Sequence, residues 1–204
     1  MKIYPSDSQL QFLNIRRITF SPETYLIAGT PSGGLDTQQS RASFFSIAHK
    51  LFSPSNMPNL RHLAISDENI EALDPILHQI ITLAIRSEYG SAAEVIADHH
   101  TFDNLKHLSL EGSFDTVETL LDHNNVELES LHLSSWMVAD DEELLARLLD
   151  FVKAEDPHNR IGRIVFYGSR EEVETDFDGP ADDLNAFEWR EDRDHSPYAD
   201  FNGR

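Results

Sequence analysis

The chain has 204 residues, of which 40% are hydrophobic and 25% charged, and this composition predicts one soluble globular domain with a tail. The first residues lack the apolar segment of a signal peptide, and no apolar run approaches the roughly 20 residues that cross a bilayer. Cysteine is also absent, so we expect an intracellular protein, cytoplasmic or nuclear. With 36 acidic and 16 basic residues, the net charge of −20 opposes binding to nucleic acid or to an anionic membrane and favours a basic protein partner.

An apolar spacing recurs along the chain, and the stretch NLKHLSLEG at residues 104 to 112 shows it well. The six triplets are, in chain order, Ile15/Ile18/Phe20, Leu60/Leu63/Ile65, Ile80/Leu83/Ile85, Leu105/Leu108/Leu110, Leu128/Leu131/Leu133 and Ile161/Ile164/Phe166. Successive triplets start 45, 20, 25, 23 and 33 residues apart, and three of these offsets lie within the roughly 20 to 29 residues of a leucine-rich repeat. Each triplet therefore predicts one buried strand.

Segments with helical spacing lie between the strands, at residues 40 to 52, 91 to 100, 114 to 123 and 140 to 156. The second begins with the capping box of Ser91 and Glu94, and the fourth begins with Asp140 and Asp141, where the helix dipole favours acids. This alternation predicts an α/β leucine-rich-repeat solenoid of about six irregular repeats, with a curved parallel sheet on the concave side and helices on the convex side. An ordinary open α/β sheet is the alternative.

The segments PNLRHLAIS and NLKHLSLEG resemble the irregular leucine-rich repeats of fungal F-box-type proteins, in which a horseshoe of degenerate repeats follows a short F-box helix module. The resemblance covers residues 10 to 168 and concerns framework positions. It implies a protein-interaction scaffold that recognises substrates for a ubiquitin ligase. No F-box-like helical segment is visible before the first repeat, and the consensus asparagine of the repeat is not maintained.

Two parts are expected: a repeat-like domain over residues 1 to 169 and an acidic tail over residues 170 to 204. The tail holds 12 acidic residues and four arginines, a net charge of −8, and it has no sustained helical or alternating pattern. We expect it to be partly disordered or to pack back as a cap through Phe177, Phe187 and Trp189.

If the strands lie side by side, the residues that flank the second and third apolar positions form an outward, concave face. The candidate binding residues on this face are Arg17, His62, Ser66, Thr82, Arg86, His107, Ser109, Glu111, His132, Arg163 and Tyr167. Small residues at its centre would leave room for a partner segment, and arginine and tyrosine near its edges are typical interface anchors. A plain solvated face is the alternative.

We predict no metal, no cofactor and no enzymatic activity. His62 and His107 are expected to lie two strands, about 10 Å, apart, and no zinc-ligand motif occurs. The glycine-rich GTPSGG at residues 29 to 34 lacks the Lys-Ser/Thr ending of a phosphate loop, and neither cysteine nor a Gly-x-Ser-x-Gly motif is present. An α/β enzyme of unrecognised type, with Asp67 or Asp140 at strand ends, remains as an alternative.

Two non-enzymatic hypotheses remain, and in both the partner is a protein. In the first, the concave face of the solenoid grips a peptide or a domain. In the second, the acidic tail binds basic proteins, the repeats hold it in place, and binding weakens with salt. The sequence leaves the identity of the partner and the oligomeric state open.

Overall fold

The structure is a computed structural model, and it describes residues 15–19, 52–66, 74–86, 104–111, 114–122, 127–139, 141–155, 160–177 and 179–190. Several features expected from the sequence lie outside these residues: the segment 29 to 34, Asp67, Asp140, the helix at 91 to 100 and, apart from Phe52, the helix at 40 to 52.

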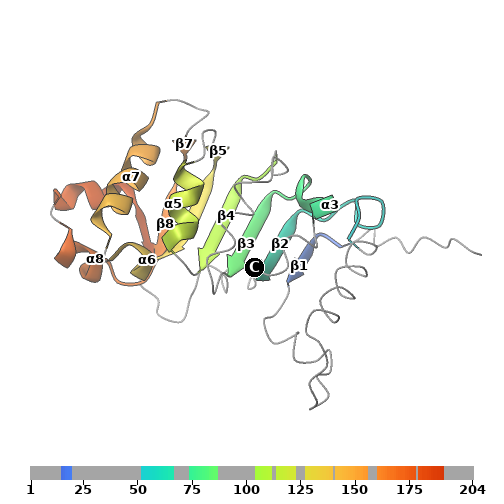
Figure 1. Cartoon of the computed structure of the whole chain (residues 1–204), viewed down its shortest axis with the longest axis horizontal. Coiled ribbons are helices and arrows are strands. Elements are labelled where there is room, and N and C mark those ends of the chain that lie inside the picture. Colours follow the sequence, from blue (N-terminus) through green and yellow to red (C-terminus); the bar gives the residue numbers. More distant parts are fainter. Residues whose placement is uncertain are drawn as a thin grey trace, which may run out of the picture.

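Seven strands form one sheet, and their order in space follows their order in the chain. They are β1 (Arg17–Thr19), β2 (His62–Ser66), β3 (Thr82–Arg86), β4 (His107–Glu111), β6 (Ser130–Ser134), β8 (Ile164–Tyr167) and β9 (Glu188–Arg190). Every neighbouring pair is parallel, and Figure 1 shows the strands side by side from β1 on the right to β8 on the left. A second, two-stranded sheet pairs β5 (Glu127–Leu128) with β7 (Arg160–Ile161). The predicted α/β fold with a parallel sheet is confirmed.

Helices follow most of the strands. They are α3 (Asp74–Leu77), α5 (Phe114–Asp122), α6 (Trp136–Ala139), α7 (Glu142–Lys153), α8 (Arg170–Asp176) and the 3-10 helix η3 (Ala181–Ala186). Helices α5 and α7 confirm the two helices expected in these regions. The carboxylate of Asp141 accepts the amide of Leu144 at 2.9 Å and so caps α7, while Lys153 lies in its last turn. The short helices α3 and α6 were not predicted.

The register of the sheet aligns the apolar triplets. Their second positions, Ile18, Leu63, Leu83, Leu108, Leu131 and Ile164, pair one after another across the sheet. Their third positions, Ile65, Ile85, Leu110, Leu133 and Phe166, do the same and continue to Trp189 in β9. We call these two rows the apolar ladder. The predicted register is therefore confirmed for the described strands.

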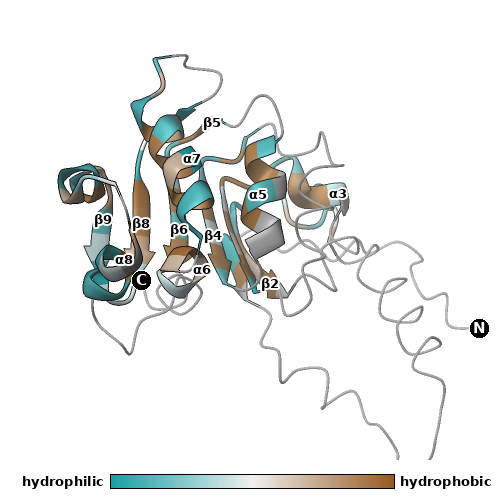
Figure 2. Cartoon of the chain, turned by 60° about the vertical axis from the view of Figure 1, so that its left-hand side comes forward, coloured by the Kyte–Doolittle hydropathy of each residue, from teal (hydrophilic) through white to brown (hydrophobic). Residues whose placement is uncertain are grey.

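The apolar ladder faces the helices, and the main core lies between them. Leu108 and Leu131 are fully buried in the same cluster as Val117 of α5 and Leu148 of α7. Figure 2 shows these helices in front of strands that are largely hydrophobic. The alternate residues of the strands point to the other side of the sheet, since successive side chains of a strand face opposite ways. We call this other side the outward face.

One backbone hydrogen-bond pattern is repeated at the starts of four successive strands. The amides of Arg61 and His62 both donate to the carbonyl of Arg16, at 3.0 and 3.1 Å. The same pattern recurs three times at 2.8 to 3.1 Å. The amides of Ile81 and Thr82 donate to the carbonyl of Arg61, those of Lys106 and His107 donate to the carbonyl of Ile81, and those of Glu129 and Ser130 donate to the carbonyl of Lys106. Each of these strands thus begins with the same local geometry as the one before it.

The segment expected to be an acidic tail contributes to the sheet as far as residue 190. Strand β9 pairs with β8. Phe187 is buried edge-on to Phe166 with the ring centroids 5.2 Å apart, and Trp189 stacks on Phe166 at 4.9 Å. Of the three apolar residues that were expected to pack back, Phe187 is buried, and Trp189 and Phe177 are partly buried against the core. Residues 191 to 204 lie outside the described part of the chain.

The sequence showed no helical pattern here, yet α8 forms. Ser169 accepts the amide of Glu172 at 3.4 Å as an N-cap, and Arg170 pairs with Glu174 one turn later at 2.5 Å. These local contacts stabilise a helix that is too short to show an apolar stripe.

Gly168 makes the turn from β8 into α8 possible. Its φ of 136° lies in a region that other residues rarely adopt, and a Cβ at this position would lie 2.0 Å from the hydroxyl of Ser135. The chain therefore turns here only because the residue has no side chain.

Candidate functional site

The outward face consists of three columns of aligned positions, which match the columns expected from the sequence. The first column holds Arg17, His62, Thr82, His107 and Ser130, with Arg163 directly before Ile164 in β8. The middle column holds Thr19, Ala64, Ala84, Ser109, His132, Val165 and Glu188. The third column holds Ser66, Arg86 and Glu111, and then Ser134, Tyr167 and Arg190.

The centre of the outward face is closed to solvent. Ala64, Ala84 and Val165 are 0% exposed, and Ser109, one of the candidate binding residues, is 7% exposed. The two alanines form an apolar cluster separate from the main core. Accessible groups on this face therefore come from the outer columns and from the strands β6, β8 and β9.

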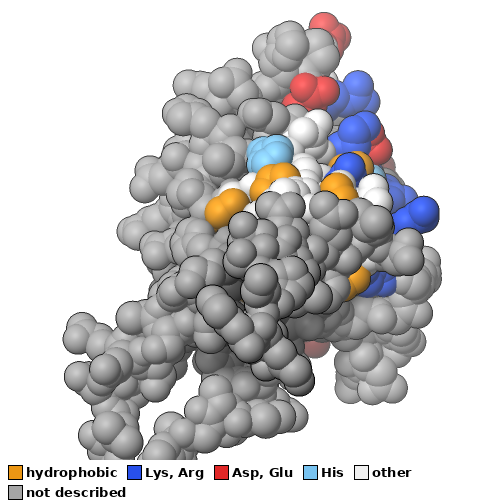
Figure 3. Space-filling model, turned by 90° about the vertical axis from the view of Figure 1, so that its right-hand side faces the viewer, with side chains coloured by type: hydrophobic (Ala, Val, Ile, Leu, Met, Phe, Trp, Pro, Cys, Tyr) orange, Lys and Arg blue, Asp and Glu red, His pale blue; other side chains and the backbone are white. Residues whose placement is uncertain are grey.

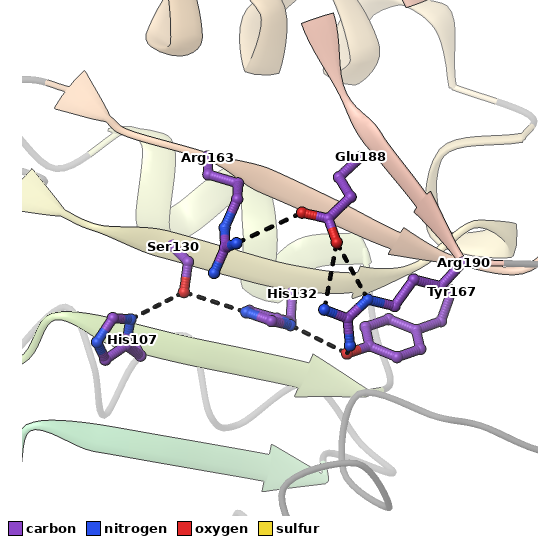
Figure 4. A network of polar contacts seen from close by, with 7 residues as sticks. All are labelled: His107, Ser130, His132, Arg163, Tyr167, Glu188 and Arg190. Carbon is purple, nitrogen blue, oxygen red and sulfur yellow. Dashed lines mark hydrogen bonds and ion pairs between the residues drawn. The ribbon is translucent and has the colours of Figure 1, made fainter. Parts of the chain in front are cut away.

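Seven polar side chains form one connected network (Figure 4). Six of them lie on β4, β6, β8 and β9, and the seventh, Arg163, directly precedes β8. His107 Nδ1 lies 2.9 Å from the hydroxyl of Ser130, and His132 Nε2 lies 3.1 Å from the same oxygen. On its other side, His132 Nδ1 lies 3.2 Å from the hydroxyl of Tyr167. Three of the candidate binding residues, His107, His132 and Tyr167, are thus brought together, with Ser130 as the link between the imidazoles.

Arginine and glutamate continue the network across β9. Arg190 donates to the hydroxyl of Tyr167 at 3.0 Å, and its guanidinium carbon lies 5.4 Å from the centre of that ring. Arg190 also donates to Glu188 at 3.2 Å through two of its nitrogens. Arg163, a further candidate, reaches the other oxygen of Glu188 at 3.5 Å. The strand order thus places residues from a span of more than 80 positions in one cluster.

The chemistry of these groups gives the network a direction. Arginine only donates, so Tyr167 accepts from Arg190 and can pass its own O–H to Nδ1 of His132. A neutral His132 then carries its proton on Nε2 and donates to Ser130, whose O–H is left for Nδ1 of His107. The proton of His107 is then on Nε2, which lies 3.7 Å from a carboxylate oxygen of Glu129. The opposite direction would turn a lone pair of His107 toward the carboxylate of Glu129.

The electrostatics agree with a neutral His132. Burial lowers the pKa of His132 from 6.5 to about 4, and the positive charges of Arg190 and Arg163 add to this effect, while Glu188 partly opposes it. The pKa of His62 is also lowered, first by burial and then by the charges of Arg17, His107 and Arg61. The pKa shift of His62 thus comes first from burial, and the cations at the strand starts add to it.

The other candidate residues lie outside the network. Arg86 and Glu111 form an ion pair of 3.7 Å, in which the Arg86 side chain is 44% exposed. Arg17 is exposed at the first strand, whereas Thr82 is half-buried between the two histidines of its column. Ser66 is the last residue of β2, and its side chain is not among those that the structure describes.

Sequence reasoning placed Ser130 on the outward face without selecting it as a binding candidate, and it missed Glu188 and Arg190. Ser130 is 1% exposed and contacts both imidazoles, a role that becomes visible only from the register. Glu188 and Arg190 flank Trp189 in a strand of three residues. Such a strand is too short to show the alternation that identifies strands in a sequence.

The environment of Ser130 resembles a nucleophile with a base, since His107 separates it from Glu129. Attack on a substrate requires an accessible oxygen next to its base. Ser130 is 1% exposed, and its hydroxyl is hydrogen-bonded to two imidazoles. The arrangement therefore fits a structural link better than a catalytic serine.

In the described part of the chain, no three His, Asp or Glu side chains lie close enough together to hold a metal ion. Among the helices within the described ranges, none is long and apolar enough to cross a membrane. No protein-family model, no curated protein and no solved structure matches the chain. Evidence for a function therefore comes from this chain's own residues.

Proposed function

We propose that the chain is a leucine-rich-repeat solenoid that acts as a non-enzymatic protein-protein interaction scaffold, with the outward face of the sheet as its concave binding surface. The observation that supports this most is the repetition of one unit: consecutive parallel strands, the same apolar pair in register, and the same shared carbonyl at four strand starts. In a doubly wound α/β enzyme the strand order reverses at the ligand site. Here the order follows the chain throughout, as it does when each repeat contacts only its neighbours.

The network supports a binding role for the outward face. His132, Glu188 and Arg190 are half-buried, and each is held by at least two hydrogen bonds or ion pairs. Side chains that are already ordered lose less conformational entropy when a partner binds. Arginine stacked on tyrosine is also a frequent anchor in protein interfaces. A rigid cluster of this kind is suited to recognition.

The resemblance to fungal F-box-type repeats suggests what the partner would be, namely a protein delivered to a ubiquitin ligase. That role stays a prediction. Its signature would be a ligase adaptor that co-purifies with the chain together with the partner.

The acidic-tail hypothesis receives less support from the contacts. Asp183 pairs with Lys153 at 2.8 Å, Glu174 pairs with Arg170 at 2.5 Å, and Glu188 pairs with arginines on both sides. These carboxylates already have basic partners within the fold. A chain that ends at Arg190 keeps β9 and lacks residues 191 to 204, so it tests the tail without removing a strand. Unchanged capture of the partner by this chain would exclude residues 191 to 204 as the binding element.

Site-specific photocrosslinking tests the scaffold role. A photoreactive residue replaces Arg86 on the outward face and, in a matched control, replaces the exposed Ala146 of α7 on the helix side. In a fungal lysate, chosen because of the resemblance, we expect Arg86 to crosslink to one dominant protein that Ala146 does not reach. Purified, this protein should bind the wild-type chain. Equal crosslinking from both positions, or none from Arg86, would argue against a binding surface on the outward face.

A further inference from the structure

Basic residues gather at the starts of the strands, although the whole chain is strongly acidic. Two aligned positions at the start of six strands define what we call the basic row. Its twelve residues are Arg16, Arg17, Arg61, His62, Ile81, Thr82, Lys106, His107, Glu129, Ser130, Gly162 and Arg163. The row holds five arginines or lysines, two histidines and one carboxylate, whereas the full chain has 16 bases and 36 acids.

These cations are accessible. Arg16 and Arg17 are exposed, and the side chains of Lys106 and Arg163 are 54% and 52% exposed. In the space-filling view of the end of the molecule where β1 lies, Lys and Arg side chains gather on the right-hand side (Figure 3). The guanidinium of Arg61 is fixed by donation to the carbonyls of Pro58 and Leu60, at 3.0 and 2.8 Å.

Carboxylates already contact the row from within the chain. Glu129 pairs with Lys106 and lies 3.7 Å from His107, and Glu188 reaches Arg163 at 3.5 Å. Lys106 and Arg163 thus already pair with carboxylates of the chain, and an acidic ligand would compete with Glu129 and Glu188 for them. The row itself holds five cations against one carboxylate, and Glu188 beside Arg163 offsets one further positive charge.

We infer that the basic row is the docking site for an acidic, extended segment of a partner protein that lies across the strand starts. This inference rests on the proposed function, because it specifies the chemistry of a partner that would dock along the edge of the outward face formed by its first column. From Arg17 to Arg163 the row crosses five strand spacings of about 4.8 Å, or about 24 Å. An extended peptide rises about 3.3 Å per residue, so seven or eight residues cover this distance.

A protein segment fits the row better than nucleic acid does. Single-stranded nucleic acids are held by a basic groove together with aromatic side chains on which the bases stack. The twelve positions of the row contain no Phe, Tyr or Trp. The net charge of −20 also repels a long phosphate backbone, whose charge density is high, more than it repels a short peptide. The net charge of the whole chain suggested a basic partner, whereas the local positive charge of the row favours an acidic one.

The test uses a fluorescent peptide of eight glutamates, with an eight-lysine peptide and an oligothymidylate of eight nucleotides as the other probes. Binding to the full chain is followed by fluorescence anisotropy. The row variant carries Arg17→Glu and Lys106→Glu. The matched control carries Arg147→Glu and Lys153→Glu on α7, which changes the net charge by the same amount. Thermal unfolding checks that each variant is folded, and Arg17→Gln with Lys106→Gln replaces the row variant if it is not.

We expect the row variant to weaken binding of the glutamate peptide at least about tenfold and the α7 variant to weaken it less than about twofold. Binding should also weaken as NaCl is raised from about 0.05 to about 0.5 M. Equal losses in the two variants, or no binding by the wild-type chain, would overturn the inference. Tighter, row-dependent binding of the oligothymidylate would overturn it in favour of nucleic acid.

The two proposals can fail separately. If photocrosslinking at Arg86 identifies a partner while the glutamate peptide does not depend on the row, the scaffold role stands and the acidic segment does not. If the peptide binds through the row but no partner crosslinks from Arg86, the row prefers anions and the scaffold role fails.

Discussion

Replacement of His132 by asparagine should remove a pH-dependent loss of stability. In the folded protein, burial and the charges of Arg190 and Arg163 lower the pKa of His132 to about 4 from an ordinary value of 6.5. In the unfolded chain the imidazole takes up its proton near pH 6.5. Between pH 6.5 and about 4 the unfolded state therefore binds more protons than the folded state, and stability falls as the pH is lowered through this interval.

The magnitude follows from the same linkage. One proton changes the free energy of unfolding by about 1.4 kcal/mol for each pH unit between the two pKa values, which gives about 3 kcal/mol for His132 over the whole interval. Asparagine does not titrate, so the variant lacks this slope. The variant also loses hydrogen bonds to Ser130 and Tyr167, and we expect it to be about 1 to 3 kcal/mol less stable near pH 7.

Urea unfolding of both proteins between about pH 7 and about pH 4 measures the effect. The other titrating groups are common to both proteins, so the difference between their free energies of unfolding isolates His132. The free energy of unfolding of the wild type, minus that of the variant, should fall by about 3 kcal/mol as the pH is lowered over this range. The control is His78→Asn, which removes an exposed imidazole outside the network, directly after α3. A difference that stays constant within the roughly 10 to 15% error of extrapolation would refute a neutral, buried His132.

Three further changes test the fold by urea or thermal unfolding. Leu108→Ala removes a fully buried member of the apolar ladder and should cost about 2 to 5 kcal/mol, and a cost below about 1 kcal/mol would contradict its place in the core. Gly168→Ala combines an unfavourable φ with a Cβ 2.0 Å from the Ser135 hydroxyl and should cost about 2 kcal/mol or more, whereas an unchanged stability would contradict this turn. Asp141→Ala removes the cap of α7 and should cost about 1 kcal/mol, without changing the glutamate-peptide affinity.

The sequence was sufficient to predict six of the seven strands of the large sheet and the columns that these strands form on its outward face. A buried strand fixes its neighbours through apolar residues, and the repeated spacing of Leu108 and Leu110 gives the register of one strand relative to the next. With the register known, the polar residues between the leucines fall into columns. This is why His107, His132 and Tyr167 could be assigned to one face before any contact was known.

The contacts within the network were beyond the sequence because they depend on side-chain conformation and on β9. Ser130 links two imidazoles only because both rings turn toward it, which spacing does not determine. Strand β9 has three residues inside an acidic segment, so composition suggested a tail. Its place in the sheet comes from Phe187 and Trp189 packing on Phe166, a tertiary contact that overrides the local pattern.

The net charge of the whole chain does not determine the sign of a local interaction. It sums over all surfaces, and a partner contacts only one of them. At distances beyond about 10 Å in physiological salt, charges elsewhere on the molecule are largely screened, so the residues next to the ligand decide the sign of the interaction. Arg16, Arg17, Arg61 and Lys106 lie on neighbouring strands of one sheet, and their alignment is a consequence of the register.

The register therefore controls the core and the site together. A slip of β8 by one residue against β6 would turn Phe166 to the outward face and Tyr167 into the helix side, since side chains alternate along a strand. The core would lose the ring on which Trp189 stacks, and His132 would lose its hydroxyl partner at the same time. Selection for a well-packed core thus also fixes the groups that the outward face presents. If the outward face binds a partner as proposed, its specificity can change most easily at exposed positions such as Arg86 and Arg163, where the side chain can vary without changing the register.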